Sequence, residues 1–427
     1  MTAKIRPNHD EAMTMSASSA TDMTDPTAVG GGGLVVRLRR SIALVCVGAV
    51  VVLAGCGGSD GDGGGGSPSS GDGARTTAPA RSSALVDMRN EDFPTPLIDP
   101  DEVRSGGPPP DGIPPIDQPT YERAAEVDWL APQEPVLSLT IDSATRAYPL
   151  RVMTWHEIVN DTLGGVPVAV TYCPLCNSGV AFERDLDGEV LTFGTSGRLY
   201  RDNLVMYDRQ TESLWPQLTG QASIGVKTGT QLTAIPLGTV AWTDFLAAHP
   251  DADVLSQDTG FAREYGSNPY TGYDEPDGDL LFDLGDDVDD RLSTKERVVG
   301  ISGESADIAY LRSALIGVDP VQIDVDGDPV VLWHESGQAS ALDTREISEG
   351  ADVGTVGVFT PIVAGQELTF SRVGDSFTDE QTGSSWDVLG RATAGSLAGE
   401  SLQPVTHLDT FWFAWVLFHP DTDLRGE

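Results

Sequence analysis

An internal duplication constrains this fold more than any other feature of the sequence. Residues 208–215 read DRQTESLW and residues 379–386 read DEQTGSSW, so five of the eight positions are identical. Residues 242–251 and 412–421 both begin with Trp and end with HPD. The aspartate that opens the first pair of segments is expected to bond nearby backbone amides in matching turns. The pattern predicts two diverged internal repeats, packed as a pseudo-symmetric pair.

Only the first repeat carries a pair of cysteines. The run from Cys173 to Cys176 (CPLC) aligns with residues 335–338, which read ESGQ, and His156 aligns with Val318. The framework is thus kept in both repeats, whereas the thiols and the imidazole are kept in one. This difference predicts a chemically active site in the first repeat.

Short apolar runs dominate both repeats. Strands are predicted at residues 136–142 and 166–172, and a hairpin is predicted over residues 179–193, where the sequence DLDG supplies the turn. Helical spacing predicts helices at residues 151–160 and 240–248. Many short strands with one or two helices per repeat predict a β-dominated α+β fold.

The amino-terminal region has the features of an export signal. Arg39 and Arg40 precede an apolar run at residues 42–53, which is too short to span a bilayer but has the length of a signal core. The run is followed by Cys56 in the sequence LAGC, which resembles a lipobox. We therefore expect export and a lipid on this cysteine that anchors the protein to the outer face of the cytoplasmic membrane. Secretory or twin-arginine export, and a start at Met23, remain open.

Composition divides the chain and limits its partners. A net charge of −39 excludes nucleic acid, because no basic stripe is present to neutralise phosphates. The membrane, through the lipid, is the one partner that the sequence predicts. The expected order is a leader and lipoprotein signal (1–56), a Gly/Ser/Asp tether (57–92), a Pro-rich extended segment (93–121), repeat 1 (122–256), an acidic connector (257–296) and repeat 2 (297–427).

The four cysteines leave one pair for chemistry. Cys46 is removed with the signal and Cys56 is used for the lipid, so Cys173 and Cys176 remain, in a compartment where disulfides persist. A CxxC pair can supply two thiolates to a metal, cycle in thiol–disulfide exchange, or staple a loop. A closed four-cysteine zinc site is excluded, since the chain has no second CxxC.

Three functional predictions follow from this pair. The first is a soft-metal site that holds Zn or Cu through Cys173, Cys176 and His156, with an open fourth position. The second is a thiol–disulfide redox protein, and the third is a non-catalytic envelope binding module with a structural disulfide; whether the protein is an enzyme stays open. Side chains expected to orient the ligands or to line the site are Glu157, Asn160, Asp161, Tyr172, Met206, Tyr207 and Arg209.

Several runs of this sequence are also specific enough, taken together, to point to a family. They are residues 106–114 (GGPPPDGIP), 147–150 (AYPL), 156–161 (HEIVND), 171–176 (TYCPLC), 206–211 (MYDRQT) and 268–270 (NPY). From about residue 93 onward the chain resembles an uncharacterised prokaryotic family, domain of unknown function 3179. The resemblance implies an exported or envelope-associated protein and brings no established activity, substrate or cofactor.

Overall fold

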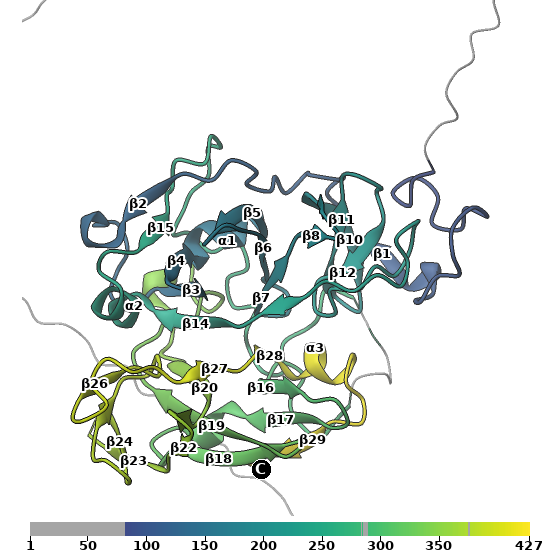
Figure 1. The fold of residues 1–427 in the computed structure, drawn as a ribbon. Coiled ribbons are helices and arrows are strands. Elements are labelled where there is room, and N and C mark those ends of the chain that lie inside the picture. The colour runs from purple at the N-terminus through teal and green to yellow at the C-terminus, as the bar shows by residue number, and fades with distance from the viewer. Residues whose placement is uncertain (1–81, 283, 285–288, 375) are drawn as a thin grey trace, which may run out of the picture. The chain divides into compact units, whose positions relative to one another are not determined.

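The computed structural model describes residues 82–282, 284, 289–374 and 376–427. The predicted signal, the predicted lipidation site Cys56 and most of the predicted tether lie outside the described residues. Strands greatly outnumber helices in the described part, which confirms the β-dominated α+β fold (Figure 1). No helix among these residues is both long and apolar enough to cross a membrane.

A five-stranded sheet frames the first half of the fold. Its order is β14-β3-β4-β15-β2, in which β15 runs parallel to β4 and all other neighbours are antiparallel. Helix α1 (Leu150–His156) follows β4 directly, and α2 (Trp242–Ala248) follows β14. The strands are β2 (Tyr121–Arg123), β3 (Pro135–Ile141), β4 (Ala144–Pro149), β14 (Leu237–Ala241) and β15 (Asp253–Leu255).

Two further sheets complete the first half. The sheet β13-β7-β6-β5 brings the cysteines to the end of β6, and the sheet β1-β10-β11-β12 packs beside it. A two-stranded hairpin, β8-β9, lies between β7 and β10 in sequence. The strands are β1 (Val103–Ser105), β5 (Ile158–Leu163), β6 (Val166–Cys173), β7 (Ser178–Glu183), β8 (Asp185–Leu186), β9 (Glu189–Val190), β10 (Phe193–Tyr200), β11 (Asn203–Asp208), β12 (Leu214–Pro216) and β13 (Ala234–Ile235).

The described residues of the second half (green to yellow in Figure 1) form three sheets of four strands each and a short hairpin. Their orders are β28-β16-β17-β29, with β29 parallel to β17, β18-β19-β20-β27 and β23-β24-β25-β26, and the hairpin is β21-β22. Helix α3 (Trp412–Val416) follows β28. The strands are β16 (Arg297–Ser302), β17 (Asp307–Leu311), β18 (Val321–Val325), β19 (Asp328–Glu335), β20 (Thr355–Thr360), β21 (Ile362–Val363), β22 (Gln366–Glu367), β23 (Phe370–Val373), β24 (Ser376–Asp379), β25 (Ser385–Trp386), β26 (Ala392–Ala394), β27 (Gln403–Pro404), β28 (Leu408–Phe411) and β29 (Asp423–Arg425).

Two predicted elements end elsewhere than expected. The helix predicted over residues 151–160 stops at His156, because Glu157 has a φ of 58° and the β-branched residues that follow enter β5. The turn predicted within residues 179–193 forms between β8 and β9, but the flanking strands β7 and β10 belong to different sheets. The expected long hairpin was therefore wrong.

The two DxxTxSxW segments form loops with the same hydrogen bonds. Asp208 accepts bonds from the backbone N–H of Thr211 (2.6 Å) and from the indole N–H of Trp215 (2.9 Å). Asp379 accepts bonds from the equivalent backbone N–H (2.6 Å) and from Trp386 (3.0 Å). The aspartate turns predicted from the sequence are confirmed, and the identities in these segments are explained by this shared loop.

Candidate functional site

The cysteine loop is a tight turn between β6 and β7. The Cys176 N–H donates to the carbonyl of Cys173 (3.2 Å), and the Asn177 N–H donates to that of Pro174 (3.2 Å). Asn177 closes the turn with a φ of 50°, and its side chain accepts a bond from the Tyr172 hydroxyl (3.1 Å). This turn places the two thiols within hydrogen-bonding reach of each other. Only 1% of Cys173 and none of Cys176 is exposed.

The turn between β10 and β11 covers Cys176. Arg201 and Asp202 both have positive φ values, as a tight two-residue hairpin requires. The Asn203 amide donates to the Cys176 sulfur (3.4 Å), and the Cys176 thiol lies 3.7 Å from the carbonyl oxygen of Asp202. The same amide also donates to Gln217 (2.9 Å), which fixes its orientation. Cys176 is therefore held in a polar but solvent-free setting.

Strand β28 of the second half also holds the cysteine loop. The carbonyl oxygen of Cys176 accepts a bond from the Thr410 hydroxyl (2.8 Å) and another from the Phe411 N–H (3.1 Å). Phe411 and Phe413 belong to the same buried apolar cluster as both cysteines. The site therefore lies where the first and second halves meet.

The two thiols differ in acidity. Burial acts to raise the pKa of Cys173, but the Cys176 thiol and the backbone N–H groups of Leu204, Cys176 and Leu175 outweigh it, so this pKa lies below its ordinary value. Burial raises the pKa of Cys176 well above its ordinary value, and the neighbouring Cys173 raises it further. Cys173 is thus the thiol of the pair that ionises first.

Glu157 lies beside Cys173 in a strained turn. It caps the C-terminus of α1 with a φ of 58°, a conformation that is costly for a non-glycine residue. Its N–H donates to the Met153 carbonyl (2.8 Å), and its carbonyl accepts from the N–H of Tyr172 (2.8 Å). Burial and the nearby Cys173 raise the pKa of the Glu157 carboxyl to about 8, against the effect of a bond from the Tyr270 hydroxyl. A carboxyl with this pKa can accept or donate a proton near neutral pH.

A cavity of about 560 Å³ adjoins this cluster. Its wall includes Leu175 from the cysteine loop, Glu157, and Leu204, whose N–H faces Cys173. The remaining lining side chains are mostly apolar or aromatic, and include Ile113, Leu199, Tyr270, Tyr273, Leu281, Arg198, Asp279 and Lys295. Neither cysteine is among the residues that line this cavity.

Sequence reasoning missed the tyrosines and the lysine of the cavity wall. Tyr270 and Tyr273 lie in the connector, more than ninety residues after the cysteines in sequence. Lys295 donates to the carbonyl oxygens of Tyr273 (2.8 Å) and Asp279 (2.7 Å), and its ammonium lies 3.6 Å from the centre of the Tyr273 ring. The NPY run at residues 268–270, which contributed to the family resemblance, was the one available signal.

His156 does not join the cysteines. Its Nδ1 is 2.6 Å from the carbonyl oxygen of Pro114, and its Nε2 is 2.6 Å from the Tyr265 hydroxyl. Both ring nitrogens are therefore engaged with the Pro-rich segment and the connector. In the part of the chain that the structure describes, no group of three or more His, Cys, Asp and Glu side chains is arranged to hold a metal ion. The expected Cys₂His set is thus not assembled, since the chain reverses after α1 and directs Glu157, not its neighbour, to the thiols.

Two of the polar residues predicted to line the site hold the framework together instead. The Asn160 amide bonds Asp117 (2.8 Å) and the carbonyl of Phe193 (2.7 Å). Asp161 accepts bonds from Arg146 (2.6 Å) and from two tyrosine hydroxyls. Both residues stand on β5, whereas Asn160 was predicted at the end of the preceding helix.

Residues predicted from β11 and its flank also have structural roles. Tyr207 donates to Asp111 (2.7 Å), and Arg209 forms an ion pair with the same carboxylate (3.1 Å), which fixes the Pro-rich segment against β10 and β11. Met206 is fully buried opposite Trp215. Of the predicted lining residues, Tyr172 donates a hydrogen bond to Asn177 of the cysteine loop, and Glu157 interacts electrostatically with Cys173.

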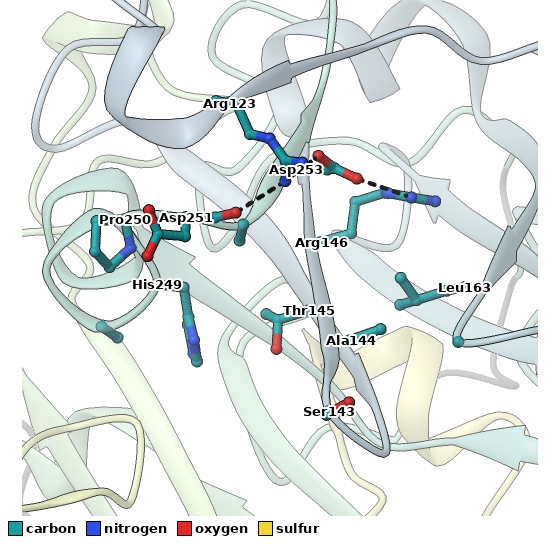
Figure 2. Close-up of a pocket in the computed structure, with 13 residues that line it drawn as sticks. Arg123, Ser143, Ala144, Thr145, Arg146, Leu163, His249, Pro250, Asp251 and Asp253 are labelled. Atoms are coloured by element: carbon teal, nitrogen blue, oxygen red, sulfur yellow. Dashed lines mark hydrogen bonds and ion pairs between the residues drawn. The ribbon is translucent and has the colours of Figure 1, made fainter.

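Figure 2 shows the residues that line a second cavity, of about 480 Å³, which include residues of β2, β4 and β15 of the five-stranded sheet. Its arginines are already paired: Arg123 with Asp253 (2.9 Å), and Arg146 with the same carboxylate (3.3 Å). Burial and the nearby Arg391 lower the pKa of His249, which also lines this cavity, to about 4. The cavity contains no thiol and is not the candidate site.

Comparison with known proteins identifies the family of this chain but assigns no activity to it. No curated protein and no solved structure matches the chain. Residues 110–422, which include the cysteine loop and both halves of the fold, match the family model described as "Protein of unknown function (DUF3179)". The chain therefore belongs to the DUF3179 family.

Proposed function

We propose that this protein is an extracytoplasmic thiol–disulfide oxidoreductase whose Cys173 and Cys176 cycle between a dithiol and a disulfide. The observation that carries the proposal is the arrangement of two adjacent buried thiols beside Glu157, whose backbone is strained and whose carboxyl is buried. A structural staple has no need of an adjacent proton-transfer group. A soft-metal site is less well supported, because both nitrogens of His156 have other partners.

In the proposed reaction Cys173 is the attacking thiol. Its thiolate is stabilised by the backbone N–H groups of Leu175, Cys176 and Leu204, and Glu157 accepts the thiol proton. The thiolate attacks one sulfur of a substrate disulfide, forms a mixed disulfide and releases the first substrate thiol. Cys176 then attacks the Cys173 sulfur and releases the second thiol. The protein loses two electrons and two protons, and the substrate disulfide gains both.

The proposal is tested by equilibrating the folded protein in buffers of reduced and oxidised dithiothreitol and trapping free thiols with a mass-labelled alkylating agent. The expected result is reversible, two-electron oxidation of Cys173 and Cys176 without unfolding. Cys176→Ser should accumulate a mixed disulfide on Cys173, and Cys173→Ser should not. A pair that changes oxidation state only after denaturation would refute the redox function and favour a staple.

Export and membrane attachment complete the proposal. The apolar run at residues 42–53 followed by LAGC, and the Gly/Ser/Asp-rich sequence after it, support a lipid on Cys56 that anchors the protein to the membrane. An oxidising compartment also suits a cycling thiol pair. Cys56→Ala is expected to release the protein from the membrane fraction. Continued membrane association of that variant would argue against the lipid anchor.

We further propose that the two halves are diverged repeats packed as a pseudo-symmetric pair. Each half contains an antiparallel set of three strands with a fourth strand added in parallel, β14-β3-β4-β15 and β28-β16-β17-β29. In each half a helix follows the first of these strands, α2 after β14 and α3 after β28. The second repeat has lost the thiols, yet its Thr410 and Phe411 hold the cysteine loop of the first. Its retention is then explained by the support it gives to that loop.

A further inference from the structure

The proposed reaction leaves the identity of the substrate disulfide open, and burial of the thiols limits it. Only 1% of Cys173 is exposed and Cys176 is not exposed at all. A disulfide on the surface of a folded protein therefore has no direct path to either sulfur. A substrate must approach through a space that borders the cysteine loop.

The cavity of about 560 Å³ borders that loop on the side of the nucleophile. Leu175 is one of the two residues between the cysteines in sequence. It lines the cavity and is partly exposed. The Leu204 side chain also lines the cavity, and its N–H is one of the groups that face the Cys173 sulfur. The proposed reaction therefore requires Leu175 to move so that the cavity connects with the thiols.

The size and lining of the cavity define what fits. Its volume is in the range of small-molecule sites, which is roughly 300–1,000 Å³. The rings of Tyr270 and Tyr273 lie 6.5 Å apart at 70° to each other, so they offer a face and an edge to a flat group. Near the entrance Leu281 is 51% exposed and adds an apolar rim.

The wall is held in place before any ligand binds. Lys295 joins the backbone of Tyr273 to that of Asp279 by two hydrogen bonds. The Tyr273 N–H also donates to the carbonyl of Leu342 in the second half (3.2 Å). One polar atom of the wall stays unpaired, since the Tyr273 hydroxyl is buried without a hydrogen-bond partner.

We infer that the substrate is a low-molecular-weight disulfide with a flat, apolar substituent that packs against Tyr270 and Tyr273 while its sulfur meets Cys173. This inference rests on the proposed dithiol cycle. As in that cycle, the substrate disulfide is the oxidant, the protein dithiol is the reductant, and two small thiols are the products. Oxidised protein substrates and large peptide disulfides are excluded by the same wall.

The test compares reaction rates of the reduced full-length protein with three disulfides: 4,4′-dithiodipyridine, oxidised glutathione and insulin. Each rate for the folded protein is divided by the rate for the same protein in denaturant, which removes the intrinsic reactivity of each disulfide. The expected result is a ratio for dithiodipyridine at least about tenfold higher than the ratios for glutathione and insulin. Equal ratios for all three disulfides would overturn the inference.

Cavity variants locate the effect. Leu281→Trp narrows the entrance from an exposed position and should lower the dithiodipyridine ratio by about tenfold. Val190→Trp is the matched control, because Val190 is 43% exposed on β9 and does not line the cavity. Equal rates for both variants would also overturn the inference. If the folded protein exchanges with dithiothreitol but shows no aromatic preference, the inference fails alone; if it exchanges with no disulfide, the redox function fails with it.

Discussion

Replacing Glu157 by glutamine is expected to stabilise the reduced protein by an amount that grows with pH. The pKa of this carboxyl rises from its ordinary 4.5 to about 8, chiefly through burial and then through the charge of Cys173. Below pH 4.5 the carboxyl is protonated in the folded and unfolded protein alike. As pH rises from 4.5 to 8 only the unfolded chain gains by releasing the proton, so stability falls across this window.

The size of the effect follows from the same pKa values. The difference of about 3.5 pH units at about 1.4 kcal/mol per unit gives roughly 5 kcal/mol of lost stability above pH 8, and about 3 kcal/mol at pH 7. Glutamine resembles the protonated carboxyl in shape and does not ionise. The gain in unfolding free energy of Glu157→Gln should therefore be near zero at pH 4 and reach about 3 kcal/mol at pH 7.

The assay is urea unfolding of the reduced protein, followed by tryptophan fluorescence, at several pH values between 4 and 9. In a Cys173→Ser background the gain should be smaller but not absent, because burial remains after the thiol is removed. The rate of thiol exchange at neutral pH should fall in Glu157→Gln by roughly a hundredfold, since the proton acceptor is lost. A gain that does not change with pH, or a loss of stability at pH 7, would refute the reasoning.

Three other perturbations probe the site. Leu175→Ala should raise the rate of reaction with small disulfides in stopped-flow measurements, because it opens the wall in front of the thiols; an unchanged rate would mean that this side chain does not limit access. Thr410→Val removes the bond to the Cys176 carbonyl and should lower the unfolding free energy by about 1 kcal/mol, whereas Thr393→Val, which removes an exposed bond on β26, should cost less in the same urea titration. His156→Gln should leave zinc and copper binding at the level of the parent protein in elemental analysis, and a loss of bound metal would restore the Cys₂His hypothesis.

The sequence was sufficient for features that depend on neighbours in the chain. The strands around residues 136–142 and 166–172 and the aspartate turns at Asp208 and Asp379 follow from alternation and from side-chain bonds over three residues. The position of the cysteines at the end of a buried strand was also predictable. Each of these features is determined within about ten residues of sequence.

Features that depend on backbone reversal or on distant segments were not predictable. The helical pattern through residues 151–160 gave no sign that Glu157 adopts a positive φ. The sequence therefore predicted His156, and not Glu157, beside the thiols. Tyr270 and Tyr273 join Leu175 in the cavity wall only because the connector returns to the first half, where Lys295 and the second half hold it. No local periodicity encodes that return.

A comparison of two buried carboxylates indicates where the chain has given up stability. Asp161 accepts bonds from Arg146, Tyr121 and Tyr148, so its charge is neutralised and its oxygens are paired. Glu157 has one tyrosine hydroxyl as a partner, a thiol as its neighbour and a strained backbone. The framework pairs the carboxylate of Asp161 completely on β5. A few residues earlier in the chain, it leaves the carboxyl of Glu157 with far fewer partners. Such a local exception is expected where a proton must be exchanged, and it supports the proposal that Glu157 and Cys173 carry the chemistry of this protein.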